Sequence, residues 1–233
     1  PNRFMEEKMS GAYMLDSLYR GTVLREGYPR NDIFRQKPDL SMKERAGFAG
    51  KTLLTYFPTY RGIFNQVERQ EYMETLSANL ALWDSQLKDD EILLIKLHPF
   101  LHGSEAFDGY RHIRAFPTDW DTYEGLNLCD VLITDYSSVS WDVLYQNKPT
   151  LFYQFDLDKY NEAHGSYIDM KTDLFGDRTE TLDQLLDSLE KTIQNNFHME
   201  PKYEKMQQEY FQFEDHEHSR HICEEIKKWM KRK

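Results

Sequence analysis

The stretch Asp130-Val-Leu-Ile-Thr-Asp-Tyr-Ser-Ser-Val-Ser140 indicates the class of fold. Its apolar run, residues 131–133, is typical of a strand buried on both faces of a parallel sheet. Polar residues follow at 135–138, before a helical pattern over 139–145. Such a helix start suits an anion, because its first turn has unpaired N–H groups and partial positive charge. An ordinary cap by Ser137 or Ser138 explains the same residues equally well.

Strand-like and helical patterns alternate on both sides of this stretch. The predicted strands are Thr22–Leu24, Thr52–Phe57, Ile92–Leu97, His112–Phe116, Val131–Thr134 and Pro149–Tyr153. Helices are predicted within 1–20 and over 139–145, Glu68–Leu87, Leu182–Gln194, Pro201–Phe211 and His218–Lys231. Alternating strands and helices indicate βαβ units and a mainly parallel sheet. We therefore predict an α/β fold, a Rossmann-like three-layer domain over 21–233, preceded by a helical segment over 1–20 that connects to another domain.

Composition limits the classes of function. The 233 residues are 39% hydrophobic, enough for a substantial core, and the formal net charge is −11. This charge argues against a general nucleic-acid or anionic-membrane surface, which would need clustered Lys and Arg. Cys129 and Cys223 are predicted to be unpaired thiols of a cytoplasmic protein. Because the chain begins with Pro1, we expect it to be a processed product or a piece of a longer protein.

Polar and basic residues follow three of the predicted strands. These strand ends are Pro58-Thr-Tyr-Arg61, Lys96-Leu-His-Pro99 and the turn at 135–138. Parallel strands place such loops at one edge of the sheet, where α/β proteins bind their ligands. Arg61, Lys96 and His98 are therefore expected to neutralise a diphosphate. No G-x-G-x-x-G or Walker loop is present, which argues against a dinucleotide dehydrogenase or a P-loop NTPase.

Five segments together resemble one known family. They are Gly27-Tyr-Pro-Arg-Asn-Asp32, Phe57-Pro-Thr-Tyr-Arg61, Lys96-Leu-His-Pro99, the stretch 130–139 and Lys148-Pro-Thr-Leu-Phe-Tyr-Gln-Phe-Asp156. In this order they resemble the CDP-glycerol glycerophosphotransferases, which are bacterial teichoic-acid polymerases and their capsule-polymer relatives. The resemblance extends from about residue 21 to the C-terminal helix and covers nearly the whole chain.

The resemblance implies the nucleotide-binding, C-terminal half of a GT-B architecture, with an N-terminal domain missing from this chain. It implies binding of CDP-glycerol or CDP-ribitol and no further cofactor. The polyol phosphate would pass to a hydroxyl of a growing polymer on a membrane lipid, with release of CMP, in a protein peripheral to the inner face of the membrane. His98 matches a histidine that the family needs for activity. The implied donor contacts are Thr59, Arg61, Lys96, Asp135, Tyr136, Ser137, Ser138, Asp215 and Ser219.

The match has two departures. The family's Trp-His-Gly-Thr motif does not occur in the chain, so the chain alone is expected to be catalytically incomplete. In the family's Asp-Asp-Gly segment, followed by Ser and Arg, His216 stands where Gly is usual, while Asp215, Ser219 and Arg220 fit. The local backbone shape at His216 is therefore in question.

Several side chains allow two interpretations. Arg30 and Asn31 are candidate contacts for the acceptor or a phosphate, although the Arg30-Asn-Asp32 run also suits a turn that caps the next segment. Asp135 is expected either to accept a hydrogen bond from a ribose or polyol hydroxyl of the donor or to brace its own loop through an Asx-turn. His216, His218 and His221 suggest a solvated helix start more than a metal site, because no recognised zinc spacing is completed. The basic tail at residues 227–233, which also contains Trp229 and Met230, suits a solvated helix end more than a membrane contact.

Two other functions remain open from sequence alone. One is a GT-B glycosyltransferase that uses a nucleotide-sugar donor on the same architecture. The other is a module without activity that binds a nucleotide or a partner domain, an interpretation supported by the missing Trp-His-Gly-Thr motif. A comparison of cytidine, uridine and guanosine diphosphate donors separates the first alternative from the main prediction.

Overall fold

The chain divides into two compact units. The computed structural model describes residues 2–60, 66–97 and 107–231. One unit comprises Pro1–Pro38 with Glu200–Lys233, and the other comprises Asp39–Met199. The predicted division after residue 20 stays a prediction.

The unit Asp39–Met199 is built on a six-stranded parallel sheet. Its strands are β1 (Thr52–Phe57), β2 (Glu91–Ile95), β3 (Ile113–Ala115), β4 (Val131–Thr134), β5 (Thr150–Tyr153) and β6 (Asp177–Thr179). They lie in the order β3-β2-β1-β4-β5-β6, and every neighbouring pair is parallel. The order reverses between β1 and β4, because the chain first builds outward to β3 and then returns to the other side of β1. The predicted α/β class with a parallel sheet is confirmed.

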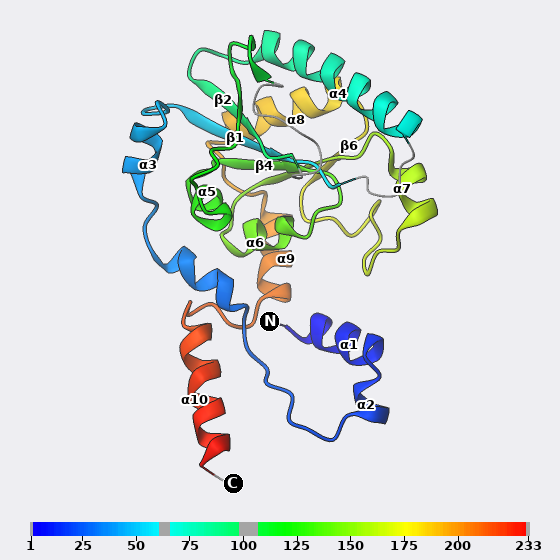
Figure 1. Cartoon of the computed structure of the whole chain (residues 1–233), viewed down its shortest axis with the longest axis vertical. Helices are drawn as coiled ribbons and strands as arrows, with labels where there is room; N and C mark the ends of the chain where they lie inside the picture. The colour runs from blue at the N-terminus through cyan, green and yellow to red at the C-terminus, as the bar shows by residue number, and fades with distance from the viewer. Residues whose placement is uncertain (1, 61–65, 98–106, 232–233) are drawn as a thin grey trace. The chain divides into compact units, whose positions relative to one another are not determined.

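Helices cover both faces of this sheet and complete three layers. They are α3 (Leu40–Arg45), α4 (Gln66–Gln86), α5 (Thr122–Leu128), α6 (Val139–Tyr145), α7 (Leu157–Ala163) and α8 (Leu182–Gln194). Successive side chains of a strand point to opposite faces. Leu54 and Tyr56 of β1 accordingly belong to the core under α4 and α8, whereas Leu53 and Phe57 belong to the core on the side of α5 and α6 (Figure 1).

The second unit is helical. It contains α1 (Arg3–Ala12), α2 (Leu15–Leu18), the 3₁₀ helix η1 (Pro29–Arg35), α9 (Pro201–Tyr210) and α10 (His218–Met230). Phe4 of α1 packs edge-to-face against Tyr210 of α9, with ring centroids 5.6 Å apart. The carboxylate of Asp32 in η1 accepts the backbone N–H groups of His218 and Ser219, each at 2.8 Å, and so caps the start of α10.

The structure corrects one predicted strand and confirms the others within a few residues. Thr22–Leu24 forms no strand, because this segment lies in the helical unit and has no strand beside it in the described residues. The strands Thr52–Phe57 and Val131–Thr134 and the helix Leu182–Gln194 have the predicted bounds. Cys129 and Cys223 are both free thiols, as predicted, and burial raises the pKa of the Cys129 thiol.

Candidate functional site

The candidate site lies at the carboxyl ends of β1 and β4, where the strand order reverses. The two strands are paired so that Phe57, the last residue of β1, lies beside Thr134, the last residue of β4. The Thr134 hydroxyl donates to the Phe57 carbonyl oxygen at 2.6 Å and ties the two ends together. Open α/β sheets bind ligands at such a reversal, because the loops from the two sides diverge there and leave a crevice.

Asp135 joins the loops that follow these two strands. Its side chain is fully buried, and its Oδ1 accepts the backbone N–H of Thr59 at 2.8 Å and that of Tyr136 at 2.6 Å. Hydrogen bonds to a carboxylate are stronger than those between neutral groups. The bracing alternative for Asp135 is therefore what the structure shows, and a contact of Asp135 or Thr59 with a donor stays a prediction.

The start of α6 presents two serines in different roles. Ser137 Oγ accepts the backbone N–H of Val139 at 3.4 Å, while the Ser137 carbonyl accepts the Ser140 hydroxyl at 2.9 Å. Ser138 is the N-cap residue by position, but its side chain makes no capping hydrogen bond and is exposed. The capping alternative therefore applies to the Ser137 hydroxyl, which accepts a helix N–H, and not to the Ser138 hydroxyl, which makes no capping hydrogen bond.

Lys96 follows β2 and points toward the start of α5. Its Nζ donates to Thr122 Oγ1 at 2.6 Å and lies 4.6 Å from the centroid of the Phe116 ring. Burial lowers the pKa of the Lys96 ammonium, and the charge of Asp121 offsets part of this shift. The predicted contact between Lys96 and a diphosphate stays a prediction, since the ammonium is engaged with α5 in this structure.

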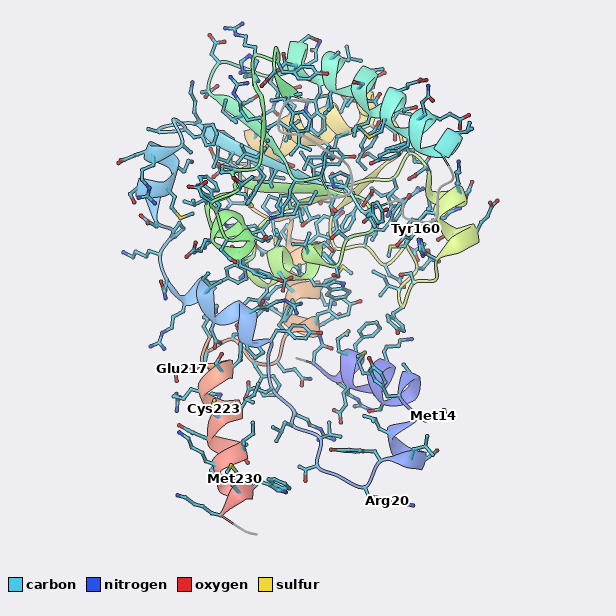
Figure 2. The ribbon with its side chains drawn as sticks, in the orientation of Figure 1. Met14, Arg20, Tyr160, Glu217, Cys223 and Met230 are labelled. Atoms are coloured by element: carbon cyan, nitrogen blue, oxygen red, sulfur yellow. The ribbon has the colours of Figure 1, made fainter. Side chains whose placement is uncertain are left out.

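Aromatic side chains line the side of the site next to β5. Tyr136 is buried, and its hydroxyl donates to Asp156 Oδ1 at 2.9 Å. The Tyr136 ring stacks on Tyr160 of α7, with centroids 3.7 Å apart and an interplanar angle of 14°. Figure 2 labels Tyr160 on this helix. Neither Asp156 nor Tyr160 was named as a site residue from sequence, although Asp156 closes the fifth motif quoted above.

Two of the predicted site residues lie outside the described residues. They are Arg61 and His98, which belong to the gaps at 61–65 and 98–106. The predicted catalytic role of His98 and the predicted phosphate contact of Arg61 stay predictions.

The remaining predicted site residues belong to the helical unit. Arg30 lies over the ring of Tyr28, with its guanidinium carbon 4.1 Å from the centroid, and Asn31 is buried. Ser219 is held through its backbone N–H by Asp32, and Asp215 Oδ1 accepts the N–H of Glu217 at 3.1 Å. Burial raises the pKa of Asp32, but hydrogen bonds from Ser219 and His218 outweigh it and hold the pKa below its usual value.

The histidines near the start of α10 lie in different surroundings: His216 precedes the helix, while His218 and His221 both lie beside the Glu26 carboxylate. His216 has a φ of 54°, so the backbone adopts the left-handed shape that favours the glycine usual in the family. His218 is fully buried, with its Nδ1 3.0 Å from Glu26 Oε1, and the interpretation as a solvated helix start is wrong for it. In the described residues, no group of three or more His, Cys, Asp or Glu side chains is arranged to hold a metal ion.

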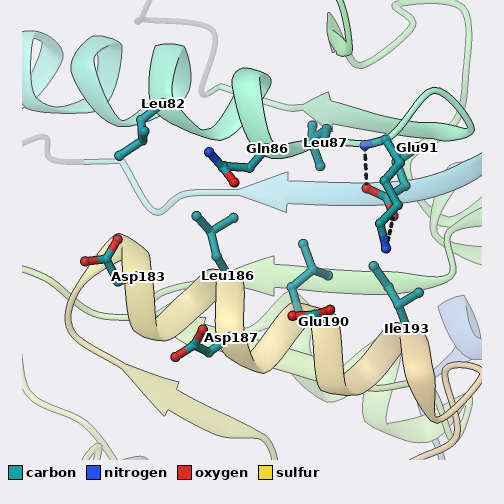
Figure 3. A pocket seen from close by; sticks show the side chains of 11 residues that line it. Leu82, Gln86, Leu87, Glu91, Asp183, Leu186, Asp187, Glu190 and Ile193 are labelled. Carbon is teal, nitrogen blue, oxygen red and sulfur yellow. Dashed lines mark hydrogen bonds and ion pairs between the residues drawn. The ribbon is translucent and has the colours of Figure 1, made fainter.

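A groove on the α4 and α8 face is a poor match for a diphosphate. Its volume is about 530 Å³, and Leu82 and Gln86 of α4 face Leu186 of α8 across it (Figure 3). Carboxylates enter its lining, and Lys88, a lining cation, is 3.9 Å from the Glu91 carboxylate. Acidic groups repel a diphosphate, so the strand-end loops remain the better candidate site.

The all-parallel sheet, the helices on both of its faces and the reversal of its strand order define an α/β domain of the Rossmann-like class. Residues 1–228 match the model of the CDP-Glycerol:Poly(glycerophosphate) glycerophosphotransferase family, and the chain belongs to this family. The resemblance stated from the five motifs is confirmed. No helix in the described ranges is both long enough and apolar enough to cross a membrane.

Three relatives illustrate the family. The teichoic acid glycerol-phosphate transferase of Staphylococcus aureus is 28% identical over 97% of this chain and 59% of its own length. The teichoic acid poly(glycerol phosphate) polymerase of Bacillus spizizenii is 26% identical over 97% of this chain and 57% of its own. A histidine variant of the wall teichoic acid polymerase TagF, soaked with CDPG, superposes with a TM-score of 0.76 at 25% identity, over 100% of this chain and 55% of its own. The chain thus spans just over half the length of these relatives.

Proposed function

We propose that this chain is the donor-binding part of a polyol-phosphate transferase. It binds CDP-glycerol, or CDP-ribitol, at the carboxyl ends of β1 and β4. The observation that supports this most is the brace at Asp135, which fixes both loops of the strand-order reversal in a chain that belongs to the glycerophosphotransferase family. A preorganised pair of loops loses little conformational freedom when a diphosphate binds between them.

The proposed reaction moves a glycerol phosphate to a hydroxyl of a growing teichoic-acid polymer on a membrane lipid. The hydroxyl oxygen forms a bond to the phosphorus that bears the glycerol, while the bond from this phosphorus to the bridging oxygen breaks. CMP leaves with the bridging oxygen. Such transfers depend on positioning and on charge stabilisation rather than on a covalent enzyme intermediate. No cofactor beyond the donor is invoked.

His98 is proposed to take part in the proton transfers of this reaction. An imidazole can take the proton of the attacking hydroxyl or donate a proton to the leaving phosphate. Arg61 and Lys96 are proposed to offset the charge of the diphosphate, which the acidic body of the protein would otherwise repel. A second domain outside this chain is proposed to supply the rest of the active site, and the protein is proposed to act at the inner face of the cell membrane.

Calorimetric titration of the intact protein with four donors tests this function. We expect CDP-glycerol or CDP-ribitol to bind, and a UDP-sugar and a GDP-sugar to bind at least about tenfold more weakly, a difference of about 1.4 kcal/mol. All four donors contain a diphosphate, and the cytidine donors differ from the sugar donors in the base and in the group on the distal phosphate. Binding of a UDP-sugar without binding of either cytidine donor would overturn the proposal in favour of a sugar transferase.

A further inference from the structure

Gln154 occupies a buried position directly after β5, next to the candidate site. Its side chain is 1% exposed. Its backbone N–H donates to the Thr179 carbonyl at 2.8 Å and extends the pairing of β5 with β6. The backbone of Gln154 is thereby fixed, and its side chain extends from a rigid strand end rather than from a loop.

The Gln154 amide joins two partners that have opposite requirements. Its Nε2 donates to the Asp135 carbonyl oxygen at 3.1 Å, and its Oε1 accepts the Nε–H of Arg178 at 2.9 Å. A backbone carbonyl only accepts, and a guanidinium only donates, so these partners determine which end of the amide faces which. Glutamate would present an acceptor to both partners and could not donate to Asp135.

This contact fixes the peptide between Asp135 and Tyr136 from both sides. The Asp135 carbonyl oxygen is held by Gln154, and the Tyr136 N–H is held by the Asp135 carboxylate at 2.6 Å. The two groups point in opposite directions across a planar peptide. Loss of either hydrogen bond permits the peptide to rotate. The side chains of Ser137 and Ser138, which follow it, would then point in a different direction.

Arg178 stabilises the arrangement from β6. Its guanidinium also pairs with Glu180, and its side chain is 23% exposed. The contacts therefore form a continuous series across three neighbouring strand ends, from Arg178 through Gln154 to Asp135. Buried polar networks in which each member has its partners make a structure rigid and specify one arrangement.

We propose that Gln154 is a positioning residue for the donor diphosphate. It acts through the Asp135–Tyr136 peptide, which it holds in one orientation and so fixes the loop after β4 that faces the ligand. This role rests on the proposed function, because the ligand is the cytidine diphosphate donor. Gln154 itself is buried and does not touch the donor.

The test compares Gln154→Glu with Asn79→Ala in the intact protein. Gln154→Glu keeps the size of the side chain and an acceptor for Arg178, so the protein is expected to fold. Asn79 of α4 is a matched control, because its Nδ2 donates to the Tyr153 hydroxyl at 2.8 Å. Tyr153 directly precedes Gln154 and packs on the other face of the sheet. The readouts are CDP-glycerol affinity by calorimetry and backbone hydrogen exchange of residues 135–139.

We expect Gln154→Glu to weaken CDP-glycerol binding about tenfold and to speed exchange at 135–139, while Asn79→Ala leaves both unchanged. Wild-type affinity and exchange in Gln154→Glu would overturn the positioning role and leave the proposed function standing. Equal losses in the two variants would also overturn it, since they would show a general effect on stability. If the wild-type protein binds no cytidine donor, the proposed function fails, and the positioning role fails with it.

Discussion

Replacement of Asp135 by alanine is expected to lower the free energy of unfolding by about 2–6 kcal/mol and to abolish measurable binding of CDP-glycerol. The change leaves the N–H groups of Thr59 and Tyr136 without their shared acceptor. Each buried group that loses its partner costs about 1–3 kcal/mol. Both loops at the strand-order reversal also lose the brace that fixes them, so a donor must order them when it binds. Urea unfolding and calorimetric titration measure the two effects.

Asp130 is the matched control for this change. It lies at the opposite end of β4, where its Oδ2 accepts the N–H of Leu53 at 2.7 Å. Asp130→Ala removes a comparable carboxylate brace between β1 and β4 and is expected to cost about 1–3 kcal/mol of stability. Donor affinity should stay at the wild-type level, because the amino ends of the strands are remote from the site. Equal loss of donor binding in the two variants would contradict the assignment of the site to the carboxyl ends.

Replacement of Gly27 by alanine is expected to destabilise the helical unit by about 1–3 kcal/mol, the usual cost of overfilling a packed site. A Cβ at Gly27 would lie 2.3 Å from Cε1 of His218. The ring cannot move away freely, because His218 is fully buried and 3.0 Å from the Glu26 carboxylate. Urea unfolding of the single variants and of the double variant Gly27→Ala/His218→Ala measures the coupling between the two positions.

The double variant is expected to be more stable than the sum of the two single effects predicts, because removal of the ring makes room for the methyl group. Gly11→Ala is the control, since a Cβ at Gly11 meets nothing within 4 Å and the residue lies inside α1. This change should stabilise the helix by about 0.5–1 kcal/mol. Strictly additive effects of Gly27→Ala and His218→Ala would show that the methyl and the ring do not compete for space.

The elements that the sequence predicts best are those with a strong apolar pattern. The runs in β1 and β4 are buried along their length, and their bounds follow from where the apolar residues stop. Strand β6 was not predicted, because Asp177-Arg-Thr179 is short and polar and pairs only at the edge of the sheet. Helix α5 was also missed, although Asp121 and Glu124 have the spacing of a helix start and Asp121 caps it.

The sequence predicts a candidate site at the strand ends, but it does not predict which hydrogen bonds join the loops there. Strand-end loops identify Asp135 and Ser138, since parallel strands end at one edge whatever their order. Whether Asp135 braces a loop depends on β1 lying beside β4, which the sequence does not reveal. Gln154 lies within the fifth motif, but its role could not be predicted because it depends on partners in β4 and β6. His218 looked solvated because its partner, Glu26, is remote in sequence.

A crystal structure of the intact protein with CDP-glycerol tests the central claim most directly. We expect the diphosphate to lie between the loops after β1 and β4, within hydrogen-bond distance of the backbone or hydroxyl groups of residues 136–139. His98 is expected to lie close to the phosphorus that bears the glycerol. A donor bound away from both loops, for example in the groove between α4 and α8, would contradict it.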